Sequence, residues 1–230
     1  MLRMHEKGVI ALPPPRRHHG NGKKYSSSSP QSDDPGSFFT VSAGDIEDLR
    51  VDLVSTQGES RLWNEFIHRY HYLGYKSLPG AQLRYVVRSN NQVLALLGFG
   101  AAAWKTAPRD QFIGWTQQQR EQHLHLVVNN ARFLILPWIK SRHLASKVLA
   151  ITAKRLPVDW QHRYNYRPVL LETFVEISKF AGTSYKAANW RCLGNTQGRG
   201  KLDTHHLNSL PIKSVWAYPL AKNFRQTLCS

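Results

Sequence analysis

The sequence is poor in several features that would assign a protein to a particular class. It contains two cysteines, Cys192 and Cys229, so it cannot form a zinc site of four thiolates, and a single disulfide would be unusual in a cytosolic chain. It has no apolar run of the ~18 residues that a membrane-spanning helix needs, and residues 1–6 lack the apolar run of a signal peptide. From these absences we expect a cytoplasmic protein.

Acidic residues are scarce as well, but only after residue 60. Residues 1–60 hold 7 Lys+Arg and 8 Asp+Glu, a net charge of −1, whereas residues 61–230 hold 24 and 7, a net charge of +17. A field of this sign attracts polyanions, and nucleic acid is the commonest polyanion inside cells. We therefore expect nucleic acid as the partner, with an anionic membrane surface as the rival on charge alone.

Histidine is frequent, but not in metal-binding patterns. The closest pairs, such as His123 with His125 and the adjacent His205 and His206, have no carboxylate or thiolate support at the spacing of a familiar site. We therefore predict no metal site.

The composition divides the chain into three parts. Residues 1–15 read as a helix end, a glycine, a strand and three prolines, which is how a winged-helix unit finishes. Residues 16–44 are rich in Arg, His, Gly, Ser and Pro over most of their length, which predicts a flexible linker. Residues 45–225 form the basic part, in which we expect one α+β domain.

The central feature of that domain is a strand followed by a helix. Residues 132–139 are apolar almost without alternation, which is typical of a strand covered on both faces. Beyond them, Leu144, Val148 and Ile151 recur at helical spacing. A second strand over 168–175 follows this helix, and the spacing predicts that the two strands are parallel neighbours.

The start of this helix is a candidate anion site. Ser141 is the expected N-cap, and Lys140, Arg142 and His143 would lie beside the free N–H groups of the first turn. Helix N-termini bind phosphate through these donors and the dipole. The alternative is that the cations are merely solvated, because the stretch lacks the glycine that phosphate loops usually carry.

The remaining elements surround this unit. The pattern predicts an amphipathic helix over 59–75 with Ser60 as its cap and His71 at its end, and a hairpin formed by 82–88 and 92–99. It also predicts a polar helix over 117–126 capped by Thr116, a short helix over 184–190 and a last strand over 214–218. Residues 109–115 read as irregular.

Many separate motifs resemble one family. They are His71-Tyr-Leu-Gly74, Gly80-Ala-Gln-Leu-Arg-Tyr85, Arg109-Asp110 with Ile113-Gly-Trp115, Asn129-Asn-Ala-Arg-Phe-Leu-Ile-Leu-Pro137, Leu144-Ala-Ser146, Leu171-Glu-Thr-Phe-Val175, Ala187-Ala-Asn-Trp190 and Thr196-Gln-Gly-Arg-Gly200. Together, over residues 61–220, they resemble the DruA-like family. The resemblance implies a role in the Druantia anti-phage defence system or beside transposase sequences on mobile elements.

The order of the elements has a weaker resemblance to the GNAT acyltransferases. That likeness implies a mixed sheet built as helix, hairpin, strand-helix, strand-helix and strand. It also implies acyl-CoA as a cofactor, with the pyrophosphate at Lys140, Ser141, Arg142, His143, Leu144, Ala145 and Ser146. Tyr185 matches the tyrosine that protonates the departing coenzyme thiolate.

These observations lead to one main functional prediction and two alternatives. The main prediction is a DNA-associated defence or mobile-element protein that acts with other defence proteins and not at a membrane. We predict nucleic-acid contacts at Arg109, Arg132, Arg191, Arg199 and Lys201. DNA is favoured over RNA as the nucleic acid.

The first alternative is an acyltransferase that modifies a nucleobase or a protein amine, with Glu172, Asp110 or His71 as base and Tyr185 as acid. The second is a metal-dependent nuclease or transposase, which would require Asp110, Asp159 and Glu172 to converge.

Overall fold

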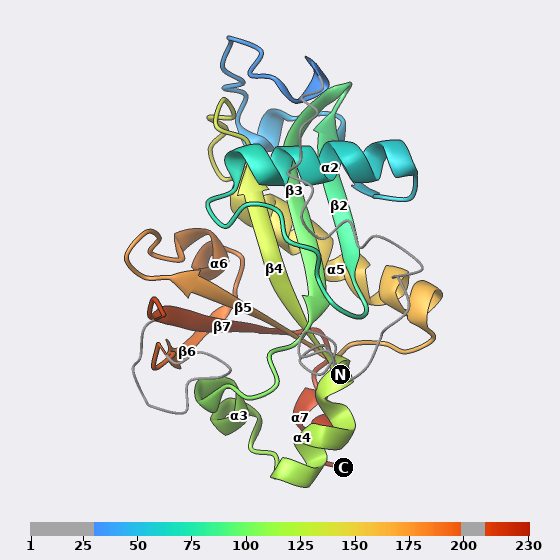
Figure 1. Cartoon of the computed structure of the whole chain (residues 1–230), viewed down its shortest axis with the longest axis vertical. Coiled ribbons are helices and arrows are strands. Elements are labelled where there is room, and N and C mark those ends of the chain that lie inside the picture. Colours follow the sequence, from blue (N-terminus) through green and yellow to red (C-terminus); the bar gives the residue numbers. More distant parts are fainter. Residues whose placement is uncertain (1–29, 199–209) are drawn as a thin grey trace, which may run out of the picture.

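Alternating and continuous apolar runs produce one mixed sheet that has helices on both faces (Figure 1). The structure is a computed structural model that describes residues 30–198 and 210–230. The predicted winged-helix remnant at 1–15, the first half of the linker, and Arg199 and Lys201 lie outside the described residues. The predicted division into domains therefore stays a prediction.

The sheet has seven strands in the order β1-β2-β3-β4-β5-β7-β6. Their bounds are β1 Leu49–Leu53, β2 Leu83–Ser89, β3 Gln92–Ala101, β4 Val127–Ile135, β5 Leu170–Glu176, β6 Arg191–Asn195 and β7 Lys213–Pro219. All neighbours are antiparallel except β4 and β5, which are parallel as predicted.

The helices are α2 Gln57–Tyr70, α3 Ala107–Ile113, α4 Gln117–His123, α5 Leu144–Tyr164, α6 Thr183–Ala187 and α7 Phe224–Leu228. Short 3-10 turns occupy Pro30–Ser32, Ala43–Asp45 and Leu124–Leu126. The structure thus confirms the expected α+β order: helix α2, hairpin β2-β3, strand β4 with α5, strand β5 with α6, and a closing strand. Strands β1 and β6 and helices α3 and α7 are additions that we did not predict. None of the described helices is both long enough and apolar enough to cross a membrane.

Helices α2 and α5 cover opposite faces of the sheet (Figure 1). Helix α2 begins two residues earlier than predicted, because Thr56 and not Ser60 is its cap, in a capping box with Glu59. Its apolar side buries Trp63, Phe66 and Ile67. The helix ends at Tyr70, and His71 becomes its C-cap.

Helix α5 supplies the core on the other face. It buries Leu144, Val148, Leu149, Leu156 and Trp160 almost completely. The predicted cap is wrong, because the residue before the helix is His143 in the left-handed conformation with φ 62°, and its side chain makes no capping bond. Ser141 lies two residues further out, and its hydroxyl is buried without a hydrogen-bond partner.

The two parallel strands separate after a short contact. Strands β4 and β5 pair only at Val127 with Leu170, Val128 with Leu171, and Asn129 with Glu172. Beyond that point they diverge, so one end of the pair is closed and the other open, as Figure 1 shows between β4 and β5. Side-chain burial alternates along β4, with Asn130 buried and Ala131 half-buried, unlike the predicted strand with both faces covered.

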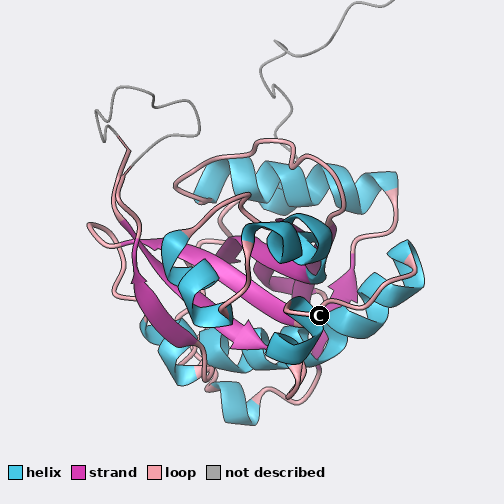
Figure 2. Ribbon diagram, turned by 90° about the horizontal axis from the view of Figure 1, so that it is seen from below, coloured by secondary structure: helices cyan, strands magenta, loops and turns pink. Residues whose placement is uncertain are grey.

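A smaller set of helices packs at the closed end. Helices α3, α4 and α7 gather below the sheet around a second apolar cluster that includes Ile113, Trp115, Phe224 and Leu228 (Figures 1 and 2). Thr116 caps α4 as predicted, through a capping box with Gln119. The segment predicted to be irregular at 109–115 contains most of α3 instead.

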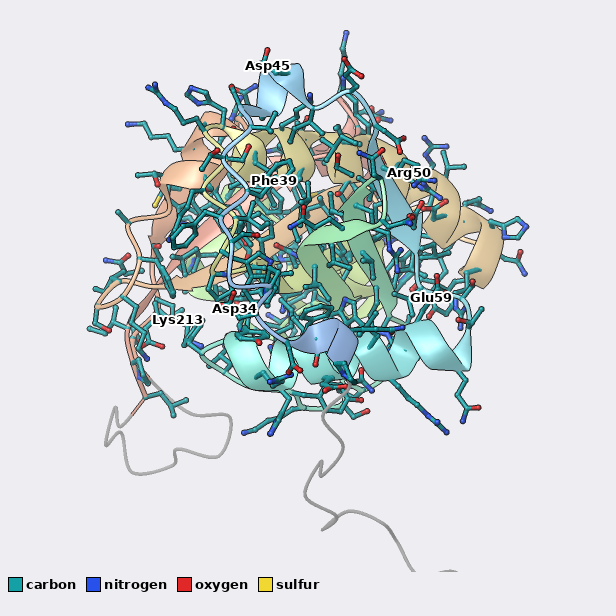
Figure 3. The ribbon with its side chains drawn as sticks, turned by 90° about the horizontal axis from the view of Figure 1, so that it is seen from above. Asp34, Phe39, Asp45, Arg50, Glu59 and Lys213 are labelled. Atoms are coloured by element: carbon teal, nitrogen blue, oxygen red, sulfur yellow. The ribbon has the colours of Figure 1, made fainter. Side chains whose placement is uncertain are left out.

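Residues 30–44 pack against the domain, although we assigned them to the flexible linker. Ser32 is fully buried and donates to Glu65 over 2.6 Å. Phe39 forms a parallel bridge with Ile139, and the amide of Ala43 donates to the carbonyl of Arg142 over 3.1 Å. Figure 3 shows this segment passing from Asp34 through Phe39 to Asp45 across one end of the molecule.

Candidate functional site

The open end of the β4–β5 pair contains a cavity of about 560 Å³, which we call the cleft. Its walls are residues 130, 131 and 133–135 of β4 and residues 173–175 of β5. It is closed by residues 70–73 at the end of α2, by residues 179–185 around the start of α6, and by Ala145 of α5. The two strand edges that face the cleft are not paired with each other, so their backbone groups have no strand partner on that side, although the carbonyl of Asn130 accepts from Thr173.

The floor of the cleft is a buried polar network. The hydroxyl of Tyr185 donates to Oδ1 of Asn130 over 2.8 Å, and Thr173 donates to the carbonyl of Asn130 over 2.9 Å. The side-chain amide of Asn130 donates in turn to the carbonyls of Gly98 and Arg132. Burial raises the pKa of Tyr185, so this phenol stays protonated at neutral pH.

The position of Tyr185 depends on a glycine. Gly182 precedes α6 with φ 71°, and a Cβ atom at that position would lie 2.5 Å from the ring of Trp216. Only glycine allows both this backbone conformation and this close approach. The ring of Tyr185 then packs edge-on against Trp190 and Phe133.

The mouth of the cleft is aromatic. Tyr72 is 40% exposed and Phe180 is 50% exposed, and their ring centroids lie 5.3 Å apart. The ammonium of Lys179 lies 4.8 Å from the centre of the Tyr72 ring and pairs with Glu176 over 2.6 Å. No aspartate or glutamate belongs to the described residues that line the cleft.

His71 is the only one of the three predicted bases that lines the cleft. Its Nδ1 accepts from the amide of Leu73 over 3.2 Å, and its ring stacks on Tyr72. Burial and the nearby charge of Arg132 lower the pKa of His71 from 6.5 to about 4. It is therefore neutral at pH 7.

Glu172 and Asp110 form a different site, at the closed end. Arg109 is fully buried and donates to Glu172 over 2.8 Å, to Asp110 over 2.8 Å and to the carbonyl of Ala103. Asp110 also accepts from the indole of Trp115 over 3.0 Å. Burial raises the pKa of Glu172, and the guanidinium of Arg109 opposes that rise.

This cluster corrects two sequence predictions. Arg109 is not accessible to nucleic acid, and the two carboxylates are committed to internal partners instead of facing the cleft as bases. Asp159, the third carboxylate considered for a nuclease, is separate from them, because it pairs with Arg155 and accepts from Tyr85. Within residues 30–198 and 210–230, no three metal-ligating side chains gather in one place.

The predicted anion site at the start of α5 is partly occupied by the chain itself. The amide of Lys140 donates to the carbonyl of Phe39 over 2.8 Å, and the ammonium of Lys147 contacts the carbonyl of Ala43. Arg142 and His143 remain exposed, and Leu144 is buried. Ala145 reaches the cleft, while the hydroxyl of Ser146 donates back to the carbonyl of His143.

Of the three predicted nucleic-acid contacts that the structure describes, only Arg191 is exposed. Arg132 is buried and donates to the carbonyls of Gly74 and Ala131, so it is not a surface contact. Arg191 is exposed on the edge strand β6. The other two predicted contacts lie outside the described residues.

Sequence reasoning missed Asn130, Thr173, Tyr72 and Phe180. Two adjacent asparagines in an otherwise apolar strand were a usable signal for Asn130, because a buried amide needs partners. No local pattern joins Tyr72 to Phe180, since they are brought together only by the packing of α2 against the strands.

One protein-family model matches most of the chain. The model described as Druantia protein DruA matches residues 3–211. The chain belongs to the DruA family. A comparison with curated proteins gives no match.

Solved structures similar to this DruA family member include several acetyltransferases. A Bacillus subtilis acetyltransferase in complex with CoA is 7% identical, covering 76% of this chain and 100% of its own, with a TM-score of 0.46. The ribosomal-protein-S18-alanine N-acetyltransferase of Escherichia coli is 11% identical, covering 75% and 95%, with a TM-score of 0.44. The polyamine N-acetyltransferase of Drosophila melanogaster is also 11% identical, covering 74% and 99%, with a TM-score of 0.44. TM-scores this low say nothing about the activity of this chain.

Proposed function

We propose that the chain is a nucleic-acid-binding component of an anti-phage defence system, and that its main ligand is DNA. The observation that carries this proposal is how the structure distributes its charges. After residue 60, each described carboxylate except Glu121 forms an ion pair within the chain. The acidic side chains are therefore neutralised internally, and most of the cations are not.

Most of the remaining described cations face solvent. The exposed ones that form no ion pair with a described residue include Lys76, Lys105, Lys140, Arg142, Lys154, Arg163, Arg167, Lys186, Arg191, Lys222 and Arg225. Exposed cations without a nearby acid attract phosphates and release condensed counterions when they bind. Because these residues lie on several elements, the interaction should depend more on the nucleic-acid backbone than on base sequence.

A pair of matched variants tests this proposal. Lys154→Gln with Arg167→Gln removes two unpaired cations, and Arg88→Gln with Asp52→Asn removes an existing ion pair without changing the net charge. In fluorescence anisotropy with a labelled DNA duplex, the first variant should bind about tenfold more weakly, and its salt slope should fall by about 2. The second should bind like the parent protein. Absence of DNA binding by the parent at 50 mM salt would reject the proposal.

Acyl transfer is the second candidate, and one feature supports it. The two parallel strands diverge around a cavity lined by both Tyr185 and the first turn of α5, which is the space that a pantetheine arm would need. Against this, the phenol of Tyr185 already donates to Asn130, and the cleft is lined by no carboxylate among the described residues.

Acetyl-CoA is the probe for this candidate. If the chain is an acyltransferase, calorimetry should show binding, and Tyr185→Phe should lower turnover about a hundredfold with nearly unchanged coenzyme affinity, because the phenol acts in the transition state. An equal loss of affinity would identify Tyr185 as a packing residue. No binding of acetyl-CoA would remove the candidate.

A further inference from the structure

The mouth of the cleft exposes two large aromatic rings that the fold does not need to expose. Tyr72 follows α2 and Phe180 follows β5, so two segments far apart in the sequence bring their rings within 5.3 Å of each other. Leu73, which also lines the cleft, is 38% exposed. An exposed apolar group that borders a cavity is typical of a binding site, whereas single exposed apolar residues are common everywhere.

The interior of the cleft suits a flat group that has its own hydrogen-bond donors and acceptors. Phe133 and Tyr185 add rings to its walls. The side chains of the floor are bonded to one another, but the facing edges of β4 and β5 leave backbone donors and acceptors without strand partners. A purely apolar ligand would leave these groups buried and unpaired, which costs free energy.

The charge around the cleft selects against a cation. No described carboxylate lines the cleft, and Glu176 at its mouth is already paired with Lys179, so a polyamine or basic peptide would enter without a free counter-charge. Lys186 on α6 and Arg191 on β6 are exposed, form no ion pair with a described residue, and belong to elements that contact each other beside the cleft. They would suit phosphates that flank the bound group.

We propose that the cleft receives one unstacked nucleobase of a bound DNA single strand, which stacks on Phe180 beside Tyr72 at the mouth. The proposal rests on the nucleic-acid binding proposed above. Aromatic side chains stack on any base because every base has a π-face, so the site should require a base without selecting its identity. A base inside a double helix could not reach the rings, and extrusion or single-stranded DNA would therefore be needed.

The test separates contacts to bases from contacts to phosphates. The full chain is titrated with two labelled single-stranded oligonucleotides of equal length and charge, one of mixed sequence and one in which three central nucleotides are abasic. The parent protein should bind the base-containing strand about tenfold or more tightly, since stacking contributes about 1–3 kcal/mol per base. The variant Tyr72→Ala with Phe180→Ala should lose this preference and keep its affinity for the abasic strand.

Phe38→Ala is the matched control, because Phe38 is 69% exposed and does not line the cleft. It should retain the preference. Equal binding of the two strands by the parent would overturn the proposed base site while leaving phosphate binding intact. An equal loss of affinity for both strands in the variant Tyr72→Ala with Phe180→Ala would also overturn it, because the two rings would then contact the DNA backbone. Failure of the parent to bind either strand would reject the underlying nucleic-acid function.

Discussion

The two ends of the β4–β5 pair contrast in almost every property. At the closed end the strands are hydrogen-bonded, and the fully buried Arg109 and Glu172 neutralise each other. At the open end the strands separate around an aromatic cleft that no described carboxylate lines. A single change, the loss of strand pairing after Asn129 and Glu172, therefore divides a structural ion-pair cluster from a candidate binding site.

This contrast shows why Glu172, whose pKa is raised, was wrongly considered as a base for the cleft. Glu172 has a raised pKa and lies next to the point of divergence, which are features of a catalytic base. Its partners are nevertheless all internal. Glu172 accepts from Arg109 and from the amide of Ala103 at the closed end, whereas the lining of the cleft begins one residue later, at Thr173.

The largest effect is expected at the closed end. Arg109→Met leaves Glu172 buried without its cation, which should lower the free energy of unfolding by about 3–5 kcal/mol in urea titrations. The double variant Arg109→Met with Glu172→Met should recover most of this loss. The defect of the single variant should shrink as pH falls towards 5, because protonation of Glu172 in the folded state removes the uncompensated charge. A loss below about 1 kcal/mol would contradict the structural role of the pair.

A smaller effect is expected where Gly182 positions α6 at the open end. Gly182→Ala forces an alanine into the left-handed region and its Cβ into the ring of Trp216, which should destabilise the protein by about 2–3 kcal/mol. Gly114→Ala is the control. Gly114 has φ 86° and no atom within 4 Å of an added Cβ, so only the backbone strain of about 1 kcal/mol should appear. Equal midpoints for the two variants in thermal unfolding would contradict the close approach.

The smallest effect concerns His71. Its pKa is about 4 in the folded protein and 6.5 otherwise, so the unfolded state binds the proton first as pH falls. Stability should be unaffected by this group above pH 7 and should fall by about 1–3 kcal/mol between pH 6.5 and pH 4. His71→Gln should flatten that part of the stability profile measured by urea unfolding. If the stability profiles of the parent and the variant have the same slope between pH 6.5 and pH 4, the side chain of His71 is solvated in the folded protein, which would contradict its burial.

The helical and strand periodicity of the sequence was enough to predict the central architecture. Leu144, Val148 and Ile151 marked α5, the alternation around Asn90 marked the β2–β3 hairpin, and the spacing of β4 and β5 predicted that they are parallel. These signals are local, because each depends on residues a few positions apart.

The site was harder to predict because its parts interact over long distances. Tyr185 lines the cleft, but its partner Asn130 is 55 residues away in the sequence. The cap of α5 was mistaken because the packing of residues 38–43 on the preceding loop, and not a serine, fixes the start of that helix. Residues 30–44 looked like linker because few of them are apolar, yet Ser32 and Ala43 are buried by contacts that composition does not reveal.

The central claim is that the chain binds nucleic acid through phosphates. The most direct test is the affinity of the full chain for single-stranded DNA between 50 and 200 mM salt. If about six phosphates are contacted, the affinity should fall by roughly two to three powers of ten over this range, with a linear dependence of log affinity on log salt. An affinity that stays constant across the range would contradict the claim.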